Sequence, residues 1–131
     1  MILYCASDLI WATRIRSTAE ALGIPSRPAR NLEMLQARLE DSPVRGMIVD
    51  LETGETALSL ITAVREWMAT ENGRPVSIVA FGPHVNVEML EAARAAGADQ
   101  VFVRGAFDRA LPQLLNQLRG RRPDSDNSEP S

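Results

Sequence analysis

Acidic side chains and the single histidine of this chain stand where the sequence predicts that strands end: Asp8, Asp50, Glu52 and His84. Asp50 directly follows the apolar run 47–49. A carboxylate in such a place can bind a divalent cation or attack a phosphoryl group as a nucleophile. Because no cysteine and no second histidine accompanies these acids, Asp8 and Asp50 together would make only a weak metal site. Two structural alternatives stay open: Asp50 caps a loop, and Asp8 caps a helix.

The basic residues narrow the chemistry further. All 14 are arginine, which excludes mechanisms that need a lysine ammonium, such as Schiff-base formation. The net charge is −3 with acids and bases interspersed, so no basic stripe suggests a nucleic-acid partner. Cys5 lies inside the apolar run 2–5 and is expected to be a small core residue.

Short apolar runs alternate with segments whose apolar residues recur every three or four positions. The apolar runs predict five strands, at 2–5, 24–29, 44–51, 76–81 and 100–103. The periodic segments predict five helices, at 9–22, at 32–39 after an Asn31 cap, at 56–68, at 87–96 and from Asp108 or Leu111 to Leu118. Pro25 and Pro28 place the second strand at an edge of the sheet, because proline has no N–H to donate.

This alternation predicts an α/β fold in a single domain, a doubly wound, five-stranded parallel sheet of the flavodoxin-like order 2-1-3-4-5. The domain is expected to span residues 1–119, with helices one and five on the same face. Residues 120–131 contain no apolar side chain to bury and are expected to be a disordered C-terminal tail. No run approaches the roughly 20 apolar residues of a membrane helix, and no signal-peptide pattern is present. A cytoplasmic protein without a membrane partner is therefore expected.

Two segments resemble a known family. Asp50 between Val49 and Leu51 is similar to the phosphoacceptor strand of the receiver domains of response regulators. Residues 95–103, Ala-Ala-Gly-Ala-Asp-Gln-Val-Phe-Val, are similar to the passage from the fourth helix to the fifth strand in that family. Together with the order of the elements, residues 2–119 resemble a receiver domain of the chemotaxis type. The resemblance implies bacterial two-component signalling or a phosphorelay as the setting.

The resemblance also implies side chains that this chain lacks. In the family, two acids at the end of strand one hold Mg²⁺, a hydroxyl ends strand four and a lysine ends strand five. Here Ala6 and Ser7 stand at the acidic pair with Asp8 one position late, Gly82 replaces the hydroxyl, and Arg104 replaces the lysine. Since Mg²⁺ needs hard oxygen ligands to neutralise the charge of phosphoryl transfer, we expect a degenerate receiver without a cofactor. Mg²⁺ bound at Asp8 and Asp50 is the alternative.

The crevice at the carboxyl ends of the strands should surround Asp50, at the phosphoacceptor position, with other small or polar residues. These are Ser7, Asp8, Glu52, Gly82, His84 and Arg104. A buried carboxylate without a partner is costly, and Arg104 is the one basic residue that this fold should bring to the crevice. We therefore expect Asp50 and Arg104 to form an ion pair, directly or through one water.

The leading hypothesis is a non-enzymatic pseudo-receiver that signals through contacts with another signalling protein or with a second copy of itself. The resemblance implies an interaction face on helix four, strand five and helix five. That face would comprise Val87, Glu91, Arg94, Gln100, Phe107 and Arg109. Two alternatives remain open: a receiver phosphorylated on Asp50 by a histidine kinase, and a small-molecule sensor or enzyme that uses the crevice around Gly82-Pro83-His84.

Overall fold

The structure is a computed structural model that describes residues 1–119, so the predicted tail 120–131 lies outside the described residues. One parallel sheet has the order β2-β1-β3-β4-β5, which confirms the predicted fold class. Its strands are β1 (Ile2–Cys5), β2 (Ser26–Pro28), β3 (Gly46–Asp50), β4 (Ser77–Gly82) and β5 (Gln100–Val103). The helices are α1 (Leu9–Ala21), α2 (Leu32–Asp41), the short 3-10 helix η1 (Leu51–Thr53), α3 (Glu55–Met68), α4 (Val87–Ala96) and α5 (Arg104–Leu118).

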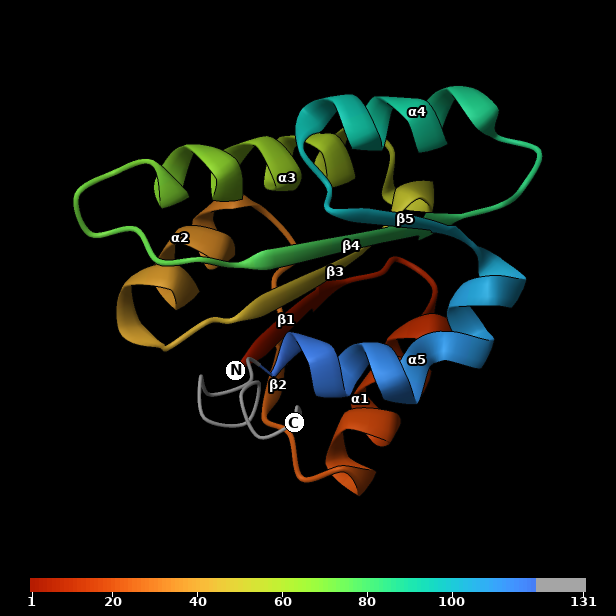
Figure 1. The fold of residues 1–131 in the computed structure, drawn as a ribbon, viewed down its shortest axis with the longest axis horizontal. Coiled ribbons are helices and arrows are strands. Elements are labelled where there is room, and N and C mark those ends of the chain that lie inside the picture. The colour runs from red at the N-terminus through yellow and green to blue at the C-terminus, as the bar shows by residue number, and fades with distance from the viewer. Residues whose placement is uncertain (120–131) are drawn as a thin grey trace, which may run out of the picture.

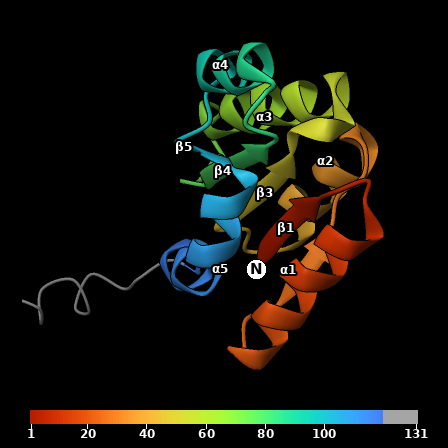
Figure 2. The same cartoon turned by 90° about the vertical axis from the view of Figure 1, so that its right-hand side faces the viewer.

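Helices cover both faces of the sheet, as Figures 1 and 2 show: α1 and α5 lie on one side and α2, α3 and α4 on the other. Side chains along β1 alternate between the two layers, because successive residues of a strand point to opposite faces. Ile2 and Tyr4 pack with α1 and α5, whereas Leu3 and Cys5 pack with α2 and α3. The structure thus confirms that helices one and five share a face and that Cys5 is buried in the core.

Local sequence signals begin and end several helices. Asp8 caps α1 by accepting a hydrogen bond from the Ile10 N–H at 2.8 Å, and Asn31 caps α2 through the Met34 N–H at 2.8 Å. These side chains satisfy N–H groups that have no partner within the helix. Gly97 ends α4 in a left-handed conformation with φ of 120°, which a side chain would disfavour. Asp8 thus fixes where the loop that follows β1 at the carboxyl ends of the strands gives way to α1.

Several predicted bounds shift by one or two residues, and two elements differ in ways that bear on the fold. β2 covers only Ser26–Pro28, although it does lie at an edge of the sheet as expected. α5 begins at Arg104 rather than at Asp108 or Leu111, and it continues through Pro112. Asp108 pairs with Arg14 of α1 instead of opening the helix. Figure 1 shows that α5 bends along its length, as expected for a helix with an internal proline.

Among residues 1–119, no helix combines the length and the apolar character needed to cross a membrane.

Candidate functional site

Asp50 is the last residue of β3 and lies completely buried, with 0% of its surface exposed. Its Oδ1 accepts a hydrogen bond from the Glu52 N–H at 3.0 Å, so the side chain caps η1. Thr53 Oγ1 donates to the Asp50 carbonyl at 2.8 Å and tightens the same turn. Asp50 Oδ2 is buried without a hydrogen-bond partner. One carboxylate oxygen of Asp50 is therefore held by a hydrogen bond, and the other is buried without one.

The pKa of Asp50 is raised above its usual value of 3.8. Burial is the largest cause, since it removes the charged form from water. The Glu52 N–H and the charge of Arg104 lower the pKa, whereas the charges of Glu52 and Asp8 raise it. The compensation from Arg104 and the backbone is thus smaller than the cost of burying the charge.

Arg104 does not pair directly with Asp50, so the expected direct ion pair is wrong. Arg104 Nη2 lies 3.2 Å from Glu52 Oε1 instead, while its Nε is buried without a partner. The cause is the turn η1, which commits Asp50 Oδ1 to a backbone N–H and leaves the half-exposed Glu52 side chain free to reach Arg104. At this crevice the cation is therefore neutralised by Glu52.

A double-mutant cycle on Glu52→Gln and Arg104→Gln tests this pairing. Because both side chains are partly exposed, we expect a coupling of about 0.2–1 kcal/mol in the free energy of unfolding by urea. The matched cycle on Glu55→Gln and Arg104→Gln should give no coupling. Equal coupling energies in the two cycles would contradict the assignment.

The other predicted crevice residues are placed as follows. Ser7 and His84 are exposed, and Asp8 caps α1. Gly82 is buried, and a Cβ built there would lie 3.2 Å from Cβ of Leu51. The space that a hydroxyl side chain would need is therefore partly filled by Leu51, which was not among the predicted crevice residues because those were all small or polar. Within the described part of the chain, no three His, Cys, Asp or Glu side chains are grouped to hold a metal ion.

Only some residues of the predicted interaction face are exposed to solvent. Glu91, Arg94, Gln100 and Arg109 are exposed, as is Val87 at 56%. Phe107 is not, which corrects the prediction: its ring is completely buried and stacks on Phe81 at 4.0 Å between centroids. On α4, β5 and the loop before α4, two further apolar residues are exposed that were not predicted to be: Val85, at 75%, and Val103, at 37%.

Comparisons with known proteins identify the fold. A scan against protein-family models finds no match, and a search of curated proteins finds none either. Solved structures do match. The receiver domain of NtrX from Brucella abortus aligns with a TM-score of 0.73 at 16% identity over 93% of this chain and 100% of that one. A signal receiver domain from Bermanella marisrubri aligns with a TM-score of 0.71 at 21% identity over 89% and 95% of the two chains.

A third neighbour is a response regulator from Burkholderia pseudomallei, solved with a phosphorylated aspartic acid, a calcium ion and citrate. It aligns with a TM-score of 0.68 at 19% identity over 98% of this chain and 71% of that chain. The protein therefore has the fold of response-regulator receiver domains.

Proposed function

We propose that this protein is a non-enzymatic pseudo-receiver, a signalling module that acts through protein contacts and not through Mg²⁺-dependent phosphorylation of Asp50. The observation that carries the proposal is the state of Asp50: a buried carboxylate whose Oδ1 caps a turn and whose pKa is raised. Phosphoryl transfer concentrates negative charge, which a receiver neutralises with a metal and a cation. Here Arg104 is engaged by Glu52, and Asp8 is engaged as a helix cap.

The contact surface in this proposal is formed by α4, β5 and α5. It contains the exposed apolar side chains Val87 and Val103 among charged neighbours, a composition that suits a protein partner. Glu91 and Arg94 of α4 and Arg109 of α5 supply charges of both signs. Another signalling protein or a second copy of this chain would bind there, and a cytoplasmic location fits such a role.

Incubation with a small phosphodonor and Mg²⁺ tests the proposal. We expect the intact mass of the protein to remain unchanged, because the crevice lacks the ligands that would hold the ion beside Asp50. Mass spectrometry after a short incubation is the measurement. A gain of one phosphoryl group that disappears in Asp50→Asn would overturn the proposal, and its loss in Asp8→Asn as well would indicate that Asp8 helps to hold the ion.

The alternative is a receiver that is phosphorylated on Asp50 by a histidine kinase. Two observations favour it: Asp50 ends β3 beside the crevice, and the Burkholderia pseudomallei neighbour carries a phosphorylated aspartic acid. Asp50 Oδ2, which has no partner, would be the attacking atom. Phosphotransfer from a kinase, followed on the same mass readout, distinguishes the two functions.

A further inference from the structure

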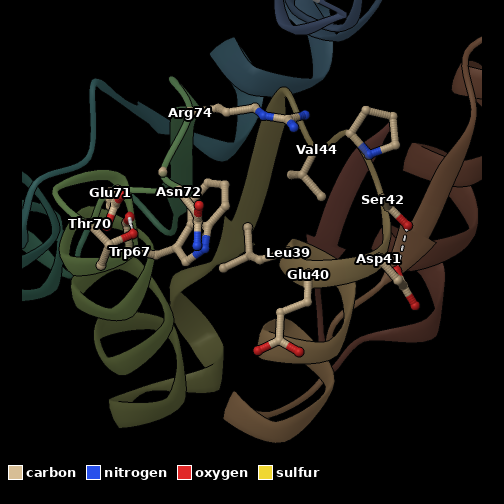
Figure 3. A pocket seen from close by; sticks show the side chains of 12 residues that line it. Leu39, Glu40, Asp41, Ser42, Val44, Trp67, Thr70, Glu71, Asn72 and Arg74 are labelled. Atoms are coloured by element: carbon tan, nitrogen blue, oxygen red, sulfur yellow. Dashed lines mark hydrogen bonds between the residues drawn. The ribbon is translucent and has the colours of Figure 1, made fainter.

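A groove lies at the end of the sheet opposite to Asp50, where β3 and β4 begin. It has a volume of about 950 Å³ and is bounded by the loop between α2 and β3 and the loop between α3 and β4. Leu39 and Val44 form its apolar floor, and the Trp67 ring stands in it against Asn72 (Figure 3). This volume lies within the range of ligand-binding pockets, and the groove takes no part in the function proposed above.

The charges that line the groove are predominantly negative. Glu40, Asp41 and Glu71 oppose the single cation Arg74. The last turns of α2 and α3 also end here, and a helix C-terminus carries a partial negative charge from its free carbonyl groups. An indole face beside these carboxylates favours a cation, above all a planar guanidinium that can stack on the ring.

One wall of the groove is held rigidly. Thr70 Oγ1 donates to the Trp67 carbonyl at 2.6 Å, and the Gly73 N–H donates to the Thr70 carbonyl at 3.0 Å. The turn is so tight that a Cβ on Gly73 would lie 2.2 Å from the Trp67 carbonyl oxygen. The site is therefore formed before any ligand binds, which reduces the entropy lost on binding.

The end of α5 lies against the start of β3, which follows the loop that borders this groove. Leu118 packs so closely on β3 that a Cβ on Gly46 would lie 2.8 Å from Cβ of Leu118. Val44 in the groove floor is two residues before Gly46, a separation of at most about 7 Å. Arg119 is occupied with the Leu22 carbonyl and Asn116, but the sequence continues with Gly120, Arg121 and Arg122. Three residues beyond Leu118 span up to about 10 Å, to which an arginine side chain adds its own length.

We propose that this groove is a guanidinium-binding site and that Arg121 and Arg122 of the same chain occupy it. Charge complementarity and proximity both support this occupant. A tethered segment binds at a high effective concentration, so two side chains suffice.

The indole N–H resonances of the full chain test the proposal. There are two tryptophans, and Trp11→Phe assigns the signal of Trp67. The double variant Arg121→Gln/Arg122→Gln should shift the Trp67 resonance, and the matched variant Asp124→Asn/Asp126→Asn should shift it much less. Glu40→Gln/Glu71→Gln should reproduce the shift of the arginine variant, and so should NaCl at about 0.5 M, which screens these charges.

Each outcome decides the proposal. An unchanged Trp67 resonance in Arg121→Gln/Arg122→Gln, or equal shifts in the arginine variant and the matched acid variant, would overturn it. A shift that disappears on dilution of the protein would overturn it too, because the arginines would then come from a second copy. A shift that is independent of protein concentration, and to which Arg121→Gln/Arg122→Gln adds nothing once Glu40 and Glu71 are already replaced by glutamine, would support it. None of these results depends on phosphorylation of Asp50.

Discussion

Replacing Phe107 by alanine is expected to destabilise the protein by about 3–5 kcal/mol, the largest effect of any single change considered for this chain. Phe107 is fully buried, stacks on Phe81 at 4.0 Å and lies 5.7 Å from the Trp11 ring between centroids. Alanine would remove the side chain that joins α5 to β4 and α1. Urea unfolding monitored by far-UV circular dichroism measures the loss, and Trp11 emission should shift to longer wavelength as water reaches the ring.

Val87→Ala is the matched control, since Val87 was predicted to share the interaction face with Phe107 but is exposed. It should change the free energy of unfolding by no more than about 0.5 kcal/mol. Phe107→Leu keeps most of the volume and provides a folded variant if the alanine variant does not fold. A small effect of Phe107→Ala, similar to that of Val87→Ala, would show that the ring is not part of the core.

Asp50→Asn is expected to stabilise the protein at neutral pH by about 1 kcal/mol. The carboxylate is buried with Oδ2 unpartnered, and an amide of the same shape keeps the acceptor for the Glu52 N–H without burying a charge. Because burial raises the pKa of Asp50 in the folded state, its contribution to stability is fully present below the usual pKa of 3.8. That contribution is lost as the pH rises through the folded pKa.

The advantage of Asp50→Asn should therefore grow from about pH 4 toward pH 7 and should be absent at lower pH. Urea unfolding at several pH values measures it. Asp8→Asn is the control, because asparagine caps a helix as well as aspartate does and α1 should keep its start. If Asp50→Asn were less stable than the wild type at pH 7, the carboxylate would have a compensating partner, such as a bridging water or an ion.

Much of the fold follows from local sequence signals. The bounds of α4 are predicted correctly because Asn86 caps its start and the left-handed Gly97 ends it. β1 and β5 are also predicted correctly, as apolar runs with polar residues at their ends. α5 is not, because its N-cap position is Val103, which offers no side-chain hydrogen bond, and because Pro112 lies in its interior. Packing against β4 and α1 holds this helix, and packing leaves no such local signal.

The site is less predictable than the fold. Asp50 and Arg104 both reach the crevice, but the partner of Arg104 depends on η1, a turn of three residues that no periodicity reveals. Leu51 fills the space beside Gly82 only because the same turn directs it inward. Such turns decide which side chains form an ion pair. A shift of the turn by one residue would bring a different carboxylate to face Arg104. The sequence therefore predicts which residues meet at the crevice, but not which pairs they form.

The two edges of the sheet differ in what they offer to a further strand. Along β2, Ala29 donates its N–H inward to the Tyr4 carbonyl, so the nitrogen of Pro28 faces outward and has no hydrogen to donate. β5 forms the other edge and contains no proline. Pro28 therefore disfavours the addition of a strand at β2, and no proline does so at β5. Two copies that joined through β5 would leave the two β2 edges outside, where Pro28 disfavours a further strand, so such growth would stop at a dimer instead of propagating into a fibre.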